Sequence, residues 1–97
     1  MYDFELTAIG LTENQRATYS GILELGKATP ARLSAETGIN RTTVYAVCKE
    51  LKEKGFVLED NLRGVTYYYP TPAKELLKIT KKERQALVEK ELIIEEL

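Results

Sequence analysis

Apolar residues recur at helical spacing in two consecutive segments between residues 29 and 55, and each segment carries its own start and stop signals. Thr29 can cap the first segment with Pro30 at the first helical position, and Gly38 supplies the left-handed residue that ends it. Asn40 can cap the second segment, and Gly55 ends it. The pattern therefore predicts a helix of about two turns, a turn of about three residues and a helix of about four turns, which is a helix-turn-helix.

The second helix, at about residues 40–54, has two chemically different faces. At about 100° per residue, its apolar face is formed by Val44, Val47, Cys48 and Leu51, which predicts the side that packs into the core. The opposite face offers hydroxyls, basic groups and an aromatic ring, which can reach base edges or phosphates in a major groove. The DNA-binding candidates on this helix are Asn40, Arg41, Thr42, Thr43, Tyr45, Ala46 and Lys49. The alternative is an ordinary amphipathic surface helix whose threonines serve only its cap.

Two runs rich in β-branched and aromatic residues follow, at about residues 56–69, on either side of a polar turn that contains Gly64. They predict a β-hairpin, and a hairpin after a helix-turn-helix is the winged-helix order. Arg63 at the tip is placed for a phosphate or a narrow minor groove, the alternative being a solvated turn residue. Alternation puts Tyr67 and Tyr68 on opposite faces. We expect Tyr67 in the core and Tyr68 among the DNA-binding candidates.

The first 26 residues predict two helices that precede this motif. Met1 to Gly10 predicts a short helix with Asp3 as a possible cap, which packs Phe4 and Ile9 on the domain or on a partner subunit. A longer helix then runs from a capping box at Thr12 and Gln15 to Gly26, and Gly21 inside it suggests a close approach of another helix. Lys27 and Ala28 can form a short strand that pairs with the hairpin.

The last segment, residues 71–97, predicts a long helix after the winged-helix domain of residues 1–70. Thr71 can cap a helix that begins at Pro72, and a second capping-box pattern at Thr80 and Glu83 suggests that it bends or restarts there. Apolar residues beyond that point share one broad sector, which we assign to dimerisation. The dimerisation candidates are Leu87, Ile93, Ile94 and Leu97. The alternative is that this stripe packs back onto its own domain.

Composition limits the class of protein. No apolar run is long enough to span a bilayer and no signal peptide is recognisable, so we expect a cytoplasmic protein that does not act at a membrane. With no histidine and one cysteine, no zinc cluster, other metal site or cofactor is predicted. Catalysis is not predicted either, because the usual acid–base residue is missing and Cys48 falls on the core face of its helix. A redox role for Cys48 would need rapid thiol labelling of the folded protein.

The charge balance argues against nucleic-acid binding, because fourteen basic residues against fifteen acidic ones give a net charge of −1. A nearly neutral protein can still bind DNA if it presents a basic stripe. The basic residues of the motif are Arg41, Lys49, Lys52, Lys54 and Arg63. We therefore predict few phosphate contacts per subunit and a modest dependence of affinity on salt.

From about Ile9 to Leu77 the chain resembles the TrmB-like family of winged-helix transcription regulators, found mainly in archaea. The residues that carry the resemblance are Leu11 to Gln15, Tyr19, Leu23 to Gly26, Gly38, Ile39, Arg41, Val44, Tyr45, Leu51, Glu53 to Gly55, Tyr67 and Pro72. The resemblance implies a dimeric DNA-binding regulator that uses Arg41, Thr42, Thr43 and Tyr45.

This sequence departs from the family pattern in three places. Cys48 stands where a leucine is usual, and Tyr68 stands where a basic residue is common. The large effector domain of the sugar-responsive members does not follow within these residues, so the resemblance implies a short form and no sugar-sensing role.

These observations predict a homodimeric winged-helix regulator, most simply a repressor that blocks its promoter by occupancy. Each subunit would place Asn40 to Lys49 in a major groove of double-stranded DNA and lay Arg63 on the neighbouring backbone or minor groove. The rival interpretation is a winged-helix module for protein–protein contacts in a transcription or replication assembly. Its support is the pI of about 5.5 and the tyrosines at positions 45, 67 and 68.

Overall fold

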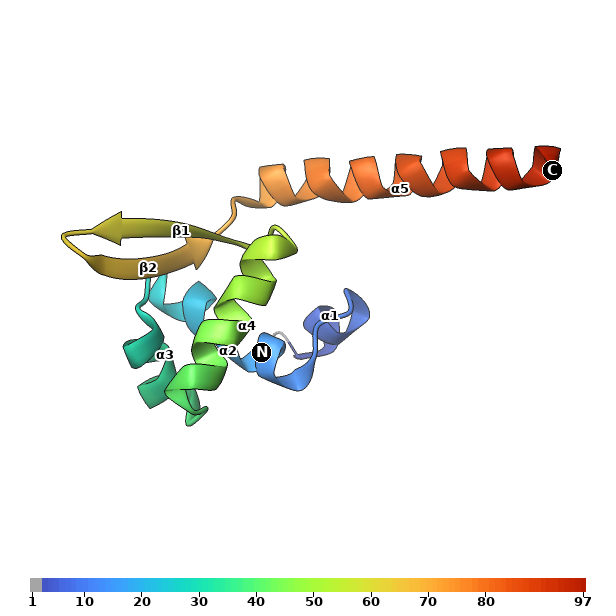
Figure 1. The fold of residues 1–97 in the computed structure, drawn as a ribbon. Coiled ribbons are helices and arrows are strands. Elements are labelled where there is room, and N and C mark those ends of the chain that lie inside the picture. Colours follow the sequence, from blue (N-terminus) through green and yellow to red (C-terminus); the bar gives the residue numbers. More distant parts are fainter. Residues whose placement is uncertain (1–2) are drawn as a thin grey trace.

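The computed structural model describes residues 3–97, with side chains described from Leu6 onward. The predicted roles of the Asp3 and Phe4 side chains therefore lie outside the described part. The chain is mainly helical with one antiparallel hairpin, as the sequence predicted (Figure 1). The elements in order are α1 (Asp3–Ala8), α2 (Glu13–Leu25), α3 (Pro30–Thr37), α4 (Arg41–Glu53), β1 (Val57–Leu62), β2 (Val65–Pro70) and α5 (Ala73–Glu96).

Helix α2 starts and packs as its sequence predicted. The Thr12 hydroxyl accepts a hydrogen bond from the Gln15 amide at 3.3 Å, while the Gln15 side chain accepts one from the Thr12 amide at 3.0 Å. This is the expected capping box. Gly21 lies where α3 comes close, since a Cβ built there would lie 3.1 Å from Cδ2 of Leu33. The predicted close approach is confirmed, and it brings α3 onto α2.

The core lies where α2, α3 and α4 meet the hairpin. Its most enclosed apolar side chains are Ile22, Leu33, Val44, Leu51 and Val57, with exposed fractions of 0 or 1%. Leu6 from α1 is also buried, whereas Ile9 is 54% exposed. Ile9 is therefore only partly covered by its own domain, and its packing on a partner subunit stays a prediction.

The hairpin is attached to the body through residue 28. Ala28 and Tyr68 exchange two backbone hydrogen bonds, of 2.9 and 2.8 Å, and form the predicted short β-bridge. This attachment turns the Tyr68 face of β2 inward, so Tyr68 is 5% exposed and Tyr67 is only half-buried. The expectation that Tyr67 is core and Tyr68 faces outward is wrong. Alternation defined the two faces correctly, but the Ala28 bridge decides which one is buried.

Helix α5 leaves the body on the side opposite to the hairpin turn and projects from it (Figure 1). It is one continuous helix from Ala73 to Glu96. The Thr80 hydroxyl donates to the Leu76 carbonyl at 3.0 Å, within the helix, and therefore caps no new segment. Thr71 does not cap it either: its hydroxyl donates to the Gly55 carbonyl at 2.7 Å, and Pro72 takes the capping position. Both predicted capping roles are therefore wrong, and Thr71 instead ties the start of α5 to the end of α4.

No residue of α5 is buried, so the alternative in which its stripe packs back onto the domain is not seen. Assignment of the stripe to dimerisation stays a prediction. None of the described helices combines the length and apolar character that a bilayer crossing requires.

Candidate nucleic-acid interface

The turn between α3 and α4 is held by side chains bonded to the backbone. The Ser34 hydroxyl donates to the Ile39 carbonyl at 2.6 Å, and the Thr37 hydroxyl accepts from the Ile39 amide at 3.2 Å. Gly38 has a φ of 75°, the left-handed conformation that ends α3. The Asn40 side chain then accepts from the Thr42 amide at 2.8 Å and starts α4. These bonds fix the direction in which α4 leaves the turn.

Helix α4 divides into the two faces that its sequence predicted. Val44, Val47, Cys48 and Leu51 are buried, and burial raises the pKa of the Cys48 thiol to about 12. The DNA-binding candidates predicted on this helix all lie outside the core. Thr43 is half-buried, and the exposed residues are Asn40, Arg41, Thr42, Tyr45, Ala46 and Lys49. Six of the seven are thus exposed to solvent, and which of them touch DNA stays a prediction.

Arg41 and Tyr45 form a pair on this outward face. They stand one helical turn apart, and the guanidinium carbon of Arg41 lies 5.9 Å from the centre of the Tyr45 ring. This is within the range of a cation–π contact. Tyr45 is nevertheless 44% exposed, so the ring supports the guanidinium without enclosing it. The donors of Arg41 remain available to a base or a phosphate.

The hairpin turn consists of two residues, Arg63 and Gly64, between the facing positions Leu62 and Val65. Both turn residues have a positive φ, 52° for Arg63 and 78° for Gly64. Two left-handed residues in a two-residue turn match the twist of the strands. Arginine rarely adopts this conformation. The exposed Arg63 side chain is therefore carried at the tip of a well-defined turn.

A hollow of about 360 Å³ brings the two parts of the motif together. Arg41 and Tyr45 line it from α4, and Gly64, Val65 and Thr66 line it from the hairpin. Thr29, Pro30 and Ala31 complete it from the start of α3. Of the eight lining residues, only Arg41 and Tyr45 were predicted as binding candidates; the six that were missed are Thr29, Pro30, Ala31, Gly64, Val65 and Thr66. Thr29 was identified only as a cap, and no local pattern marks a residue that the fold brings beside α4.

Tyr68 is removed from the interface by its burial. Its hydroxyl donates to Oε1 of Glu59, the facing residue on β1, at 3.0 Å. Burial, followed by this carboxylate, raises the pKa of Tyr68 above its ordinary value. Tyr68 therefore stabilises the hairpin's attachment, and its prediction as a DNA-binding residue is wrong.

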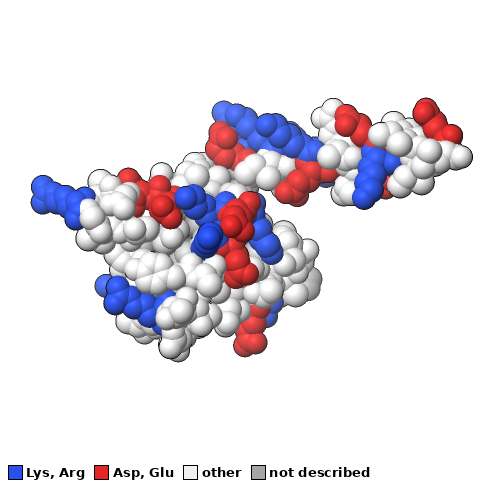
Figure 2. Space-filling model, in the orientation of Figure 1, with Lys and Arg blue, Asp and Glu red and all other residues white. Residues whose placement is uncertain are grey.

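Three basic residues on the exposed side of the motif are in no ion pair of the described chain. In the described part of the chain, the ion pairs include Lys27 with Asp60 at 2.9 Å and Lys52 with Glu59 at 3.7 Å, but none that involves Arg41, Lys49 or Arg63. Figure 2 shows basic side chains distributed over the body, with acidic ones between them. The face thus offers a few separate cations, which fits few phosphate contacts per subunit.

The helix-turn-helix and hairpin of this chain match a known protein family. The sequence model of the family described as "Sugar-specific transcriptional regulator TrmB" matches residues 6–74. This chain belongs to the TrmB family. The match spans the helix-turn-helix, the hairpin and the start of α5, so the family resemblance deduced from the sequence is confirmed. A search among curated proteins found no match.

Solved structures show the same fold. One is TrmBL2, described as an archaeal chromatin protein with a novel mode of DNA binding: 23% identity, TM-score 0.75, covering 95% of this chain and 35% of that one. A transcriptional regulator from Thermotoga maritima is 23% identical with a TM-score of 0.62, over 88% of this chain and 62% of its own. A MarR family protein from Bacillus stearothermophilus is 18% identical with a TM-score of 0.63, over 94% and 71%. The chain spans about a third of the TrmBL2 chain's length.

Proposed function

We propose that this chain binds double-stranded DNA sequence-specifically as a transcription regulator. Its family consists of transcription regulators, and its fold is the winged helix. The observation that carries the proposal is the common exposed face of α4 and the hairpin turn, where Arg41, Tyr45 and Gly64 line one hollow. Exposed side chains on rigid elements are what base readout requires.

In the proposed complex, the first half of α4 enters a major groove. Arg41 has the fork of donors that binds a guanine edge or a phosphate, and the exposed methyl group of Ala46 can contact a thymine methyl. Lys49 lies two turns further on, where a phosphate contact is expected. Arg63 at the hairpin turn reaches the flanking backbone or minor groove. The Asn40 side chain keeps its amide donors, since only its carbonyl oxygen serves the cap.

We further propose that the regulator is a homodimer that represses by occupying its promoter in the cytoplasm. Two copies related by a two-fold axis would read a pseudo-palindrome, with half-sites about one helical turn or a multiple of it apart. The exposed apolar residues of α5, Leu87, Ile93, Ile94 and Leu97, support pairing of the two copies.

The role of Arg41 is tested by titrating a selected duplex with the Arg41→Ala variant. Loss of a base or phosphate contact should weaken binding by about 1–3 kcal/mol per contact, which is roughly fivefold to 150-fold. Fluorescence anisotropy with a labelled duplex at fixed salt gives the affinity. Helix α4 should fold unchanged, because the Arg41 side chain is exposed.

Arg84→Ala is the matched control, since it removes one exposed arginine from α5, away from the motif. Its affinity should stay within about twofold of the parent protein's. Equal losses for the two variants would show that only overall charge matters, and an unchanged affinity for Arg41→Ala would remove this residue from the interface.

A further inference from the structure

One side of helix α5 carries a stripe of mainly apolar residues along its whole length, with two charged residues, Glu83 and Lys90, within it. At about 100° per residue, every third or fourth side chain falls on the same side of the helix. We call this set the α5 stripe: Leu76, Ile79, Thr80, Glu83, Ala86, Leu87, Lys90, Ile93, Ile94 and Leu97. Its large apolar residues beyond Glu83 are all exposed, with fractions between 56% and 98%. An apolar surface of this size in water is expected to have a partner.

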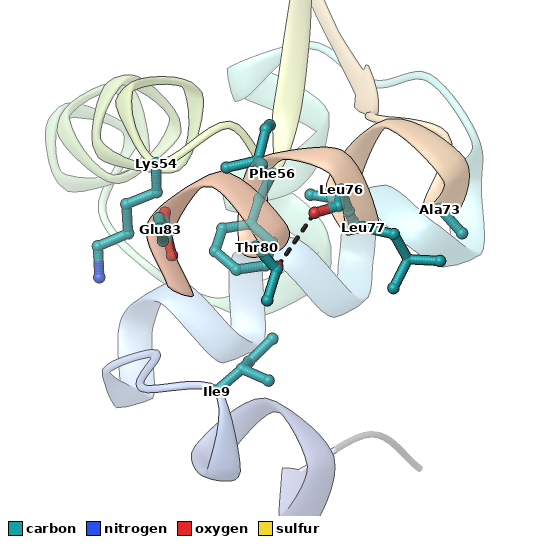
Figure 3. A pocket seen from close by; sticks show the side chains of 9 residues that line it. Ile9, Lys54, Phe56, Ala73, Leu76, Leu77, Thr80 and Glu83 are labelled. Carbon is teal, nitrogen blue, oxygen red and sulfur yellow. Dashed lines mark hydrogen bonds between the residues drawn. The ribbon is translucent and has the colours of Figure 1, made fainter. Parts of the chain in front are cut away.

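At its first turns, the α5 stripe forms one wall of a groove of about 720 Å³. Leu76, Ile79 and Thr80 line that wall, while Ile9 and Phe56 line the groove from the body. Figure 3 shows the Phe56 ring lying between the first turns of α5 and the Ile9 side chain. The groove is mainly apolar, is partly open to solvent and has the α5 stripe as one of its walls. A helix laid along the α5 stripe would therefore enter it.

The charges of α5 are segregated along its length. Residues 73–84 hold five basic side chains, Lys74, Lys78, Lys81, Lys82 and Arg84, and two acidic ones, Glu75 and Glu83. Residues 85–97 hold four acidic side chains, Glu89, Glu91, Glu95 and Glu96, and one basic one, Lys90. Figure 2 shows this on the face in view, with basic residues over the first turns and acidic ones at the tip. Two such helices are complementary in charge when they run antiparallel and repel when they run parallel.

We propose that the groove is filled by the C-terminal end of α5 from a second copy of this chain, with the two α5 helices paired antiparallel. The proposal rests on the homodimer proposed above and specifies its geometry. A single register matches the α5 stripe to itself throughout. It pairs Leu76 with Leu97, Ile79 with Ile94, Thr80 with Ile93, Glu83 with Lys90, and Ala86 with Leu87.

This register accounts for both charged residues of the α5 stripe. Glu83 of each copy faces Lys90 of the other, so two symmetric ion pairs form between apolar contacts. A parallel pair would instead set Glu83 against Glu83 and Lys90 against Lys90, each in an otherwise apolar seam. Like charges facing one another in a seam oppose association. The antiparallel pair also brings Leu97 and Ile94 to the mouth of the groove beside Leu76, where Ile9 is 54% exposed and Phe56 is only half-buried.

Charge reversal tests the register in the full chain. Glu83→Lys alone, or Lys90→Glu alone, places like charges at both facing positions and should raise the dimer dissociation constant by about tenfold or more. The two substitutions together restore opposite charges and should return the constant to within about threefold of the parent protein's. Sedimentation equilibrium over a dilution series measures it. A parent chain that stays monomeric at high concentration, or a double variant as weak as the single ones, would overturn the proposal.

A disulfide experiment gives the direction of the helices independently. Leu76→Cys and Leu97→Cys chains, oxidised separately, should form no linked dimer, because each new thiol faces a leucine. Mixing them before oxidation should yield a linked pair. Linking of either chain with itself would indicate a parallel pair and contradict the proposal. The parent chain is the control for Cys48, which is buried.

Failure of this proposal can be told from failure of the proposed function. If the dimer register is wrong and the protein still enriches a DNA sequence, the DNA-binding proposal stands and the two copies associate in a different way. If the mixed chains link and no sequence is enriched, the antiparallel pair stands and the DNA proposal falls.

Discussion

The winged-helix body and helix α5 use apolar side chains in opposite ways. In the body, Ile22, Leu33, Val44 and Leu51 are wholly enclosed by neighbouring elements. In α5, Leu87, Leu92, Ile93 and Ile94 are between 55% and 63% exposed, and none of the helix's 24 residues is buried. The body can therefore draw its stability from its own contacts, whereas α5 keeps apolar surface that a single chain does not cover. The contacts within one copy thus account for the winged-helix body, whereas the exposed side of α5 is where we propose that a second copy binds.

The largest expected effect separates the two regions directly. Leu51→Ala removes a fully buried side chain from α4 and should lower the free energy of unfolding by about 2–5 kcal/mol, because it leaves a cavity. Urea unfolding followed by circular dichroism measures it. The loss should appear at every protein concentration, since the contact lies within one chain.

Leu92→Ala is the matched control in α5. Leu92 lies on the side of the helix away from the α5 stripe and is 55% exposed. It should change the free energy of unfolding by less than about 0.5 kcal/mol. A loss as large as that of Leu51→Ala would mean that α5 contributes a core of its own, and the contrast between the regions would be wrong.

The joint between the regions should be the next most sensitive point. Gly55 has a φ of 85°, and a Cβ there would lie 2.7 Å from Cδ1 of Ile79 on α5. Gly55→Ala should therefore lower the free energy of unfolding by about 2 kcal/mol, from backbone strain and displacement of Ile79. Thermal unfolding at low protein concentration measures the change.

Gly38→Ala provides the comparison, because Gly38 has a φ of 75° with nothing within 4 Å of the added Cβ. It should lower the free energy of unfolding by about 1 kcal/mol, the backbone cost alone. Equal losses at the two glycines would show that Ile79 moves aside freely and that α5 is only loosely seated on the body.

A smaller effect concerns pH and is confined to the body. Burial raises the Cys48 pKa from 9.0 to about 12, so the folded protein keeps the thiol neutral while the unfolded chain ionises. The neutral Cys48 thiol makes its full contribution to the free energy of unfolding below pH 9, and this contribution is lost as the pH rises from 9 towards 12. The free energy of unfolding should fall by about 1 kcal/mol between pH 8 and pH 10.

Cys48→Ala isolates this contribution. The variant is less stable at both pH values because of the missing sulfur, but its decrease between them should be smaller than that of the parent protein. Tyr19 and Tyr68, whose pKa values are also raised by burial, act at still higher pH in both proteins. Equal decreases would contradict the enclosed position of Cys48, as would rapid thiol labelling of the folded chain.

Local signals predicted most of the fold, because they depend on residues adjacent in sequence. Thr12 with Gln15, Thr29 with Pro30, and Gly38 with Asn40 mark helix ends through bonds that form within a few residues. The buried face of α4 followed from helical periodicity alone. These features need no knowledge of the distant parts of the chain.

The errors fall where a distant contact decides. Period-two alternation separates Tyr67 from Tyr68 but does not say which is inside, and the bridge to Ala28 settles that. Thr71 can cap a helix in isolation, yet its hydroxyl bonds to Gly55, sixteen residues earlier. The hollow beside Arg41 is equally non-local, since α3, α4 and the hairpin all line it. Sequence patterns therefore located α4 and the hairpin better than they located the set of residues that line the junction between them.

The most direct test of the DNA-binding proposal is selection from a pool of random duplex DNA with the purified chain, with molar mass measured by light scattering. We expect a two-fold symmetric motif to be enriched by a particle of twice the chain mass, and enrichment to be lost with Arg41→Ala. A folded dimer that enriches no sequence at low salt would contradict the proposal and favour the protein–protein interaction module.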